Sequence, residues 1–458
     1  MTLAPDDDAL AHYATAVRGL LDRGGFELGG STAQAARWEI NHVREYLDQH
    51  GAPDARPTVH VAGSKAKGSV ATMTEAILRA SLPPVEGSAR TVLYTSPDLH
   101  AARERIVIDG EPIDHGRFAR IAEAVRTDPG TEGWSYFELL TLIAWQAAAE
   151  VRAQWVVLEV GLGGRLDTTN AIAEKAVAVI TPIDLEHTAI LGETIAEIAA
   201  EKAGILTGPT EVVVAPQRAS ALNVIRAAAD KAGTTLHEIA EECALTVSKQ
   251  SLDELQFDLR TPLRTYRGLT LSLIGRHQAE NAAAAIRAAE LAMASQGGEL
   301  DDQGTHRALA AVRLPGRTEI IGRKPLTIVD GAHTPLAAKR LRQALDETGV
   351  PRARVFVLGL LDGKDAESIV RALLGPQDQV FVAPPTSPRA ADPSEAAAEI
   401  RALGAPVSTA PDVATALERA TVAAGDRGAV IVTGSLRTVA DAREARMVIT
   451  GDRALGLR

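Results

Sequence analysis

Short runs of apolar, mostly β-branched residues recur along the chain and are separated by longer stretches with helical periodicity. Runs that keep apolar residues at consecutive positions are typical of strands buried on both faces, and helices between such strands indicate a parallel sheet. The chain is therefore predicted to have an α/β fold. The predicted strands are residues 57–61, 91–94, 155–160, 176–181, 326–330, 355–360, 379–383 and 429–433, and the clearest helices are residues 138–150, 278–294, 335–346, 365–374 and 393–403.

The predicted strands form two groups, one on either side of the Ala-rich helix at residues 278–294. A chain of 458 residues is long for one domain, since domains mostly have about 50–250 residues. We predict two α/β domains: residues 1–313, with the larger parallel sheet, and residues 314–458, with a smaller Rossmann-like sheet. Alternating apolar residues between positions 252 and 273 predict a small antiparallel appendage to the first domain.

Charge and composition exclude several classes of protein. The chain has 48 Lys and Arg against 59 Asp and Glu, a net charge of −11, which argues against broad electrostatic binding to nucleic acid or anionic lipid. No apolar run reaches the ~18 residues of a membrane span, and no signal peptide is visible. The single cysteine, Cys243, excludes an intramolecular disulfide and a Cys-based zinc cluster. We expect a cytoplasmic protein without nucleic-acid or membrane partners.

A glycine- and lysine-containing loop follows the predicted strand at residues 57–61 and opens a helix. This strand–loop–helix context is the one that a phosphate-binding loop requires, because free N–H groups at the helix start and the helix dipole favour an anion. Lys67 is predicted to reach the terminal phosphates and Ser69 to ligate Mg²⁺. The alternative is a polar turn, and Ala66 would be strained by ~1 kcal/mol if its φ is positive. The loop consists of Gly63, Ser64, Lys65, Ala66, Lys67, Gly68 and Ser69.

Glu159 lies near the end of the predicted strand at residues 155–160 and is followed by a glycine-rich segment at residues 161–164. Ligands of open α/β sheets bind at the carboxyl ends of the strands. One interpretation is the start of a dinucleotide fingerprint, but Leu166 occupies its third glycine position. The other is that Glu159 holds a second metal ion opposite the phosphate-binding loop. We favour the metal, because an unpaired Glu is seldom buried.

The loop after the predicted strand at residues 176–181 contains Asp184, Glu186 and His187, and Lys202 follows on a helix. A lone histidine is more often a hydrogen-bonded structural residue than a ligand. Here it follows one parallel strand, while Glu159 ends another. We therefore predict His187 as a metal ligand.

Taken together, these segments resemble the folylpolyglutamate synthase/dihydrofolate synthase family of the Mur ligase superfamily. The match extends over most of the chain in the same order, and EVGLGGRLDTTN and GRHQAENA are long and specific. Further matching segments are residues 93–113, 137–141, 275–286, 314–319 and 330–335.

The resemblance implies a Mur-ligase-like domain with a parallel sheet and a P-loop, followed by a Rossmann-like glutamate-ligase domain. It implies an ATP-dependent ligase that adds L-glutamate to dihydropteroate, to reduced folates or to both. The substrate carboxylate attacks the γ-phosphate to give an acyl phosphate, which the amine of glutamate then attacks. ATP and Mg²⁺ at two sites are the implied cofactors, and a monomer with its active site between the domains is expected.

The resemblance also assigns roles to residues of the first domain. Lys67 and Ser69 match residues that hold the nucleotide phosphates and one Mg²⁺. Glu159 and His187 match the ligands of the second metal ion. Lys202 matches the lysine that the family carbamylates, which converts a cation into an anion able to support that metal.

Other matching positions complete the implied site. Asn281 and Arg317 match nucleotide contacts, and the planar guanidinium of Arg317 suits phosphate. Asp330 and His333 match the contribution of the second domain to the nucleotide and amino-acid site.

Three differences from the family leave the substrate open. Lys65 and Ala66 depart from the usual phosphate loop GTNGKGS, and Thr334 replaces the Asn of DGAHNP. Asp98 replaces a His in the segment that helps bind the pterin; a carboxylate there would accept hydrogen bonds from a pterin or repel an anionic group. The alternatives are a divergent paralogue that ligates another carboxylate and amino acid, or a catalytically silent nucleotide-binding homologue. A cell-wall Mur ligase would need a region that recognises a uridine nucleotide, and none is visible.

Overall fold

The computed structural model describes residues 7–25, 28, 39–208, 210–375, 377–449 and 451–457. Its larger sheet has the strand order β4-β3-β2-β5-β1-β6-β7-β8. From β2 to β8 neighbouring strands are parallel, whereas β3 and β4 form an antiparallel edge. The strands are β1 (Thr58–Ala62), β2 (Thr91–Tyr94), β3 (Ile106–Ile108), β4 (Glu111–Pro112), β5 (Trp155–Glu159), β6 (Val177–Ile180), β7 (Glu211–Val214) and β8 (Thr235–Glu238).

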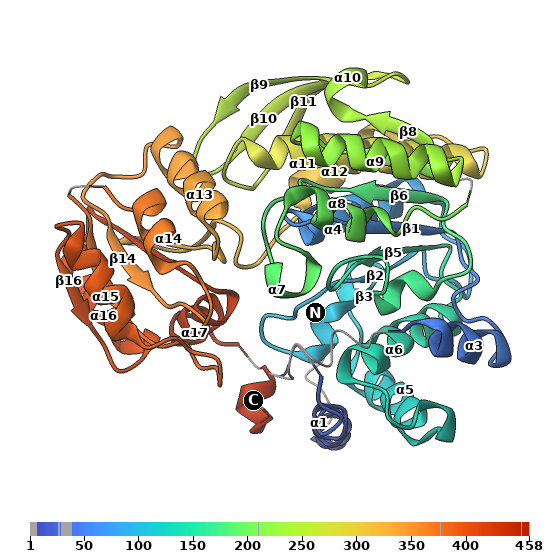
Figure 1. The fold of residues 1–458 in the computed structure, drawn as a ribbon, viewed down its shortest axis with the longest axis horizontal. Helices are drawn as coiled ribbons and strands as arrows, with labels where there is room; N and C mark the ends of the chain where they lie inside the picture. The colour runs from blue at the N-terminus through green and yellow to red at the C-terminus, as the bar shows by residue number, and fades with distance from the viewer. Residues whose placement is uncertain are drawn as a thin grey trace.

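Helices cover both faces of this sheet, and the central strands β1, β5 and β6 are therefore buried at every position. Alternate residues of β6 show the division: Val177 and Val179 pack on the face covered by α4 and α11, and Ala178 and Ile180 pack on the face covered by α8 and α9. On the same face as α8 and α9, α6 packs over β2, α5 packs against α6, and α1 packs against α5 (Figure 1). The helices are α1 (Asp7–Leu21), α3 (Asn41–Gln49), α4 (Lys67–Ser81), α5 (His115–Thr127), α6 (Tyr136–Glu150), α7 (Thr188–Leu191), α8 (Ile195–Ala203), α9 (Ala219–Ala232), α10 (Ile239–Glu242), α11 (His277–Ser295) and α12 (Asp302–Ala311).

A three-stranded antiparallel sheet packs on α11 and confirms the predicted appendage, although it begins earlier than residue 252. Its strands are β9 (Ala244–Gln250), β10 (Leu255–Arg260) and β11 (Thr265–Leu271). Phe257, Leu259 and Tyr266 are fully buried in the core that this sheet shares with α11. The helix α12 between α11 and the next sheet is not anticipated from the sequence. A domain boundary between residues 313 and 314 stays a prediction.

The second sheet has six strands in the order β12-β13-β17-β14-β15-β16, all parallel except β12. Helices α13, α14 and α15 pack on one face, and α16 and α17 pack on the other. The strands are β12 (Glu319–Arg323), β13 (Leu326–Val329), β14 (Val355–Leu358), β15 (Gln379–Val382), β16 (Val407–Thr409) and β17 (Ala429–Thr433). The helices are α13 (Pro335–Glu347), α14 (Ala366–Leu373), α15 (Pro393–Ala402), α16 (Val413–Ala424) and α17 (Leu436–Arg446).

The predicted α/β fold with two parallel-rich sheets is confirmed. Every predicted strand and helix named above is present, with ends within two residues of the prediction. In the described part of the chain, no helix is both long enough and apolar enough to cross a membrane.

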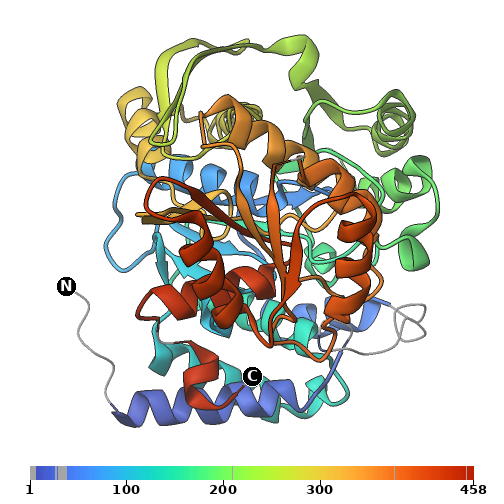
Figure 2. The ribbon, with the colours of Figure 1, turned by 90° about the vertical axis from the view of Figure 1, so that its left-hand side faces the viewer.

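The C-terminal residues after α17 leave the second sheet and pack against helices of the first sheet. The short helix η5 (Asp452–Leu455) lies close to α1, and both views place the C-terminus beside that helix (Figure 1, Figure 2). Leu457 packs in the same hydrophobic cluster as Tyr13 and Phe118. The last residues therefore connect the second sheet to the helices of the first.

Candidate active site

The phosphate-binding loop runs from the end of β1 into α4 and is fixed to the loop that follows β6. Gly63 has φ +144°, and a Cβ on it would lie 1.9 Å from Oγ1 of Thr181, so only glycine fits there. The backbone N–H groups of Ser64 and Lys65 both donate to the carbonyl oxygen of Pro182, at 3.1 and 3.0 Å. The helix α4 then begins at Lys67, so its free N–H groups open towards the carboxyl edge of the sheet.

Ala66 is in the left-handed conformation that the sequence raised as a condition, with φ 68° and ψ 6°. The left-handed conformation costs an L-residue about 1–2 kcal/mol, and glycine removes that cost. Glycine also raises the conformational entropy of the unfolded chain, which offsets about 0.4–1 kcal/mol of the gain. We therefore expect Ala66→Gly to raise the free energy of unfolding by up to about 1 kcal/mol, measured by denaturant titration. The control is Ala80→Gly within α4, which should lower the free energy of unfolding by about 1 kcal/mol. Equal destabilisation by both changes would contradict the strain.

A cavity of about 1300 Å³ lies at the carboxyl ends of β1, β5, β6 and β13 and brings most of the predicted site residues together. Gly63 and Lys202 are buried outside its lining. The predicted residues that line it are Ser64, Lys65, Ala66, Lys67, Gly68, Ser69, Glu159, His187, Asn281, Arg317, Asp330 and His333.

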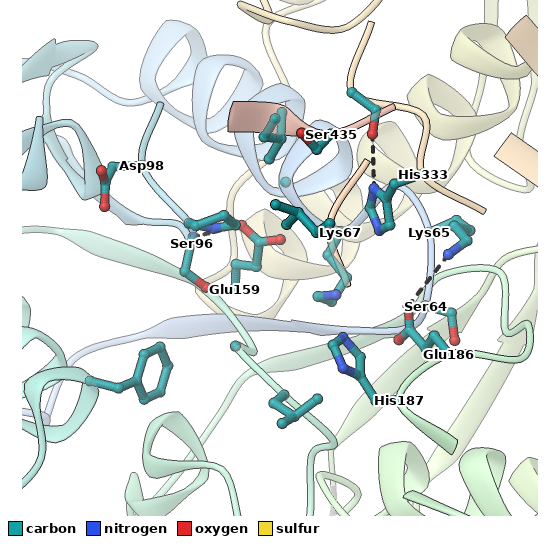
Figure 3. A pocket seen from close by; sticks show the side chains of 18 of the residues that line it. Ser64, Lys65, Lys67, Ser96, Asp98, Glu159, Glu186, His187, His333 and Ser435 are labelled. Atoms are coloured by element: carbon teal, nitrogen blue, oxygen red, sulfur yellow. Dashed lines mark hydrogen bonds and ion pairs between the residues drawn. The ribbon is translucent and has the colours of Figure 1, made fainter. Parts of the chain in front are cut away.

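Glu159 is buried at the end of β5, and its Oε2 accepts a hydrogen bond from the backbone N–H of Ser96 at 3.0 Å. Burial raises the pKa of the Glu159 carboxyl, while the nearby charge of Lys67 opposes that rise. A Cβ on Gly68 would lie only 3.2 Å from Oε2, so glycine leaves room for the carboxylate against the start of α4. Figure 3 shows Lys67 pointing between Glu159 and His187.

His187 directly precedes α7 and has a left-handed backbone, with φ 47°. Burial lowers its pKa to about 4, so the imidazole is neutral at pH 7 and has a lone pair for a metal ion. Among the described residues, no three His, Cys, Asp or Glu side chains are placed to hold a metal by themselves. Mg²⁺ usually takes one or two protein ligands plus substrate phosphates. All three predicted metal ligands line the cavity, Ser69 for one ion and Glu159 with His187 for the second, so each predicted ion has one or two protein ligands.

Glu186 joins two lysines of the predicted site, although Glu186 itself is not among the predicted site residues. Its Oε1 accepts a hydrogen bond from Lys202 Nζ at 2.8 Å. Its Oε2 lies 3.5 Å from Lys65 Nζ, as Figure 3 shows. Although burial alone would raise it, the charges of Lys202 and Lys67 hold the pKa of Glu186 well below its ordinary value. Burial lowers the pKa of the Lys202 amine to about 8. Glu186 directly precedes the predicted metal ligand His187, and this position in the sequence could have identified it as a site residue.

The loop after β13 brings Asp330 and His333 to the opposite wall. Asp330 accepts hydrogen bonds from the backbone N–H and hydroxyl of Thr318 at 2.8 and 3.0 Å, which fixes the segment that carries Arg317. Burial raises the pKa of Asp330 and the charge of Arg317 opposes this. Burial also lowers the pKa of His333 to about 3. Thr334 caps α13 by accepting from the N–H of Ala337, so threonine keeps a capping function there.

Other cavity residues from the second sheet were not identified in the sequence. Lys364, Arg389 and Ser435 line the cavity from the loops that follow β14, β15 and β17. These loops follow the carboxyl ends of parallel strands, as the loop of Asp330 does. That position could have identified the three residues as site residues from the sequence.

Asp98 lines the cavity but its charge is compensated within the protein. Nε of Arg105 donates to Oδ1 of Asp98 at 2.7 Å, and both side chains are buried. The guanidinium of Arg105 also lies 5.3 Å from the ring centre of Tyr136. The cavity therefore presents an ion pair at this place, so Arg105 offsets the negative charge that the sequence analysis expected to repel an anionic group.

His277, at the start of α11, also lines the cavity and gives a pH dependence. Burial, and then the charge of Arg340, lower its pKa from 6.5 to about 4. Between these values the unfolded chain binds a proton that the folded protein does not, so the free energy of unfolding falls as the pH drops from 6.5 towards 4. We expect His277→Gln to reduce the loss of stability between pH 7 and pH 5, measured by denaturant titration. If the variant lost as much stability as the wild type between pH 7 and pH 5, His277 would not be a source of this pH dependence.

Comparison with known proteins agrees with the arrangement. The Mur ligase middle domain matches residues 61–289, and the Mur ligase, glutamate ligase domain matches residues 316–436. The dihydrofolate synthase/folylpolyglutamate synthase of Mycobacterium tuberculosis is 33% identical over 440 aligned residues, which cover 88% of this chain and 89% of that protein.

Solved structures of such enzymes have the same fold. Mycobacterium tuberculosis folylpolyglutamate synthase complexed with ADP has a TM-score of 0.85 at 31% identity, covering 97% of this chain and 100% of that chain. A bifunctional folylpolyglutamate synthase/dihydrofolate synthase from Yersinia pestis, complexed with AMPPNP and a Mn ion, has a TM-score of 0.76 at 30% identity, covering 89% and 93%. The chain belongs to the folylpolyglutamate synthase/dihydrofolate synthase family of the Mur ligase superfamily.

Proposed function

We propose that this protein uses ATP to join L-glutamate to the carboxylate of dihydropteroate, of a reduced folate or of both. The observation that supports this most is a single cavity in which the phosphate-binding loop and Glu159 face loops of the second sheet. The names and ligands of the related proteins, and the match to a glutamate ligase domain over residues 316–436, agree with it.

The reaction proceeds in two steps. An oxygen of the substrate carboxylate attacks the γ-phosphorus of ATP, and ADP leaves. The amine of glutamate then attacks the carbonyl carbon of the acyl phosphate, loses a proton and expels inorganic phosphate. Lys67 and Arg317 neutralise charge that develops on the transferring phosphoryl group. The cavity walls from both sheets keep water away from the acyl phosphate.

Divalent metal completes the proposed site. Ser69, Glu159 and His187 would hold Mg²⁺ together with the phosphates, and the ion neutralises phosphate charge. Whether one or two ions bind is decided by metal titration in the presence of a non-hydrolysable ATP analogue. Two equivalents are expected, and a single equivalent would exclude the second site.

A carbamate on Lys202 is also part of the proposal. In the structure the Lys202 amine is paired with Glu186, so a carbamate would place two anions side by side and would need a cation between them. With ¹³C-labelled bicarbonate, Mg²⁺ and an ATP analogue, wild-type protein should give a carbamate carbon signal that Lys202→Arg lacks. The same spectrum for both proteins would exclude the modification.

The substrate is tested with the purified protein, ATP, Mg²⁺, L-glutamate and either dihydropteroate or tetrahydrofolate. ADP release in equal amount to a product that is heavier by one glutamyl residue is the expected result. If another carboxylate alone drives ADP release, the folate assignment fails and the ligase assignment stands. The absence of ATP turnover with every carboxylate tested would instead indicate a catalytically silent homologue. We further propose that the protein is cytoplasmic and monomeric. Light scattering after size-exclusion chromatography measures the mass in solution, and the mass of one chain is expected.

A further inference from the structure

One buried carboxylate near the C-terminus joins three distant parts of the chain. Asp452 is 0% exposed, and its Oδ1 accepts a hydrogen bond from the hydroxyl of Tyr13 in α1 at 2.8 Å. Its Oδ2 accepts from the backbone N–H of Ala102 at 2.9 Å, 350 residues away in the sequence. Its own N–H donates to the carbonyl oxygen of His100 at 2.9 Å. The C-terminus is thus fixed to residues 100–102.

These residues lead directly into the cavity. The short helix η2 (Ala102–Arg105) begins at Ala102, whose N–H donates to Asp452. An N–H group at the start of a helix has no partner within the helix itself. The helix ends at Arg105, which lines the cavity in an ion pair with Asp98. Asp452 therefore fixes one end of the helix whose other end presents the ion pair.

A second contact ties the same segment to α17 of the second sheet. Nδ1 of His100 lies 2.9 Å from Oε1 of Glu444, and Arg453 lies 3.2 Å from the other oxygen of that carboxylate. Within the segment, Oε2 of Glu104 accepts from the backbone N–H groups of Leu99 and His100. Residues 98–105 are therefore held from both sheets, without regular secondary structure of their own beyond η2.

We propose that Asp452 is a positioning residue for the carboxylate-substrate side of the cavity. We place that side at Asp98, because Figure 3 shows Asp98 across Glu159 from Lys65 and Lys67 of the phosphate-binding loop. Asp452 holds residues 98–105 so that Asp98 and Arg105 meet the substrate in one fixed geometry. The identity of that substrate rests on the proposed function, whereas the restraint on the segment does not.

The kinetic test is Asp452→Asn in the full chain. If the amide NH₂ of asparagine faces the N–H of Ala102, two donors oppose each other and that hydrogen bond is lost. If it faces Tyr13, whose oxygen already accepts from the N–H of Arg103, the Tyr13 hydroxyl proton loses its acceptor. We expect KM for dihydropteroate to rise about 10-fold while KM for ATP stays within about twofold. Tyr13→Phe, which removes one donor and keeps the ring, should cause a smaller rise in the same direction.

A matched control is Asp392→Asn, because Asp392 is an exposed helix-capping carboxylate that accepts from the N–H of Ser394 at 2.8 Å outside the cavity. It should change neither KM. An equal change in both KM values for Asp452→Asn, or no change in either, would overturn the positioning role.

Amide hydrogen exchange separates this proposal from the proposed function. Asp452→Asn should speed exchange at residues 99–105 and leave residues 63–69 as in the wild type, whatever substrate the enzyme takes. If the wild type ligates no pteroate but the exchange result holds, the substrate assignment fails and the positioning role stands. Unchanged exchange at residues 99–105 would refute the positioning role even in an active enzyme.

Discussion

Lys67→Ala is expected to lower the rate of ATP-dependent ligation by about 10²-fold or more, on the scale of removing one electrostatic stabiliser of a transition state. Lys67 begins α4 and lines the cavity, and its charge acts on both Glu159 and His187. The expectation rests on the proposal that the Lys67 ammonium group balances charge on the transferring phosphoryl group. The measurement is ADP release at saturating ATP.

Lys65→Ala is the matched control for this change. Lys65 is in the same loop, but Glu186 lies 3.5 Å from its ammonium group, so we expect a smaller loss. If Lys67→Ala kept near wild-type turnover while Lys65→Ala lost it, Lys65 would be the functional lysine. The alignment of the loop with the family would then be wrong.

Glu159→Gln is expected to lower kcat by about 10²-fold and to raise the Mg²⁺ concentration needed for half-maximal rate. The amide oxygen of glutamine can still accept from the N–H of Ser96, so the change removes the charge and keeps the shape. Turnover measured over a range of Mg²⁺ concentrations separates a loss of metal affinity from a loss of chemistry.

The control for this variant is Glu75→Gln. Glu75 is also a buried carboxylate, on α4, but it pairs with Arg79 and is outside the cavity lining. It should affect stability more than turnover. A Glu159→Gln enzyme with wild-type rate and an unchanged Mg²⁺ requirement would exclude Glu159 as a metal ligand.

The central strands were predictable because burial on both faces leaves a continuous apolar run. The strands β1, β5 and β6 are buried at every position, and their sequences show it. The edge strands β8 and β16 are partly exposed and polar, so they carry no such signal. The strand β7 reads EVVV with three buried residues and has the same signature, yet its short run was not recognised.

The site divides in a similar way. Ser64, Glu159 and His187 lie at or after the carboxyl ends of β1, β5 and β6, and parallel strands bring those ends to one edge of a sheet. Their meeting in one cavity therefore follows from the order of strands and loops. Asp330 follows β13 of the other sheet, so its place in the cavity depends on how the two sheets pack. The contact of Asp452 with Ala102 has no such basis, because it joins irregular segments whose approach depends on the packing of the whole molecule.

The central claim is that the substrate carboxylate is activated by direct phosphoryl transfer from ATP in this cavity. It is tested most directly with dihydropteroate carrying ¹⁸O in its carboxylate, incubated with the enzyme, ATP, Mg²⁺ and L-glutamate. An acyl phosphate intermediate requires one ¹⁸O atom to leave with the phosphate, so we predict labelled inorganic phosphate in equal amount to the glutamylated product. Formation of that product with unlabelled phosphate would contradict the account.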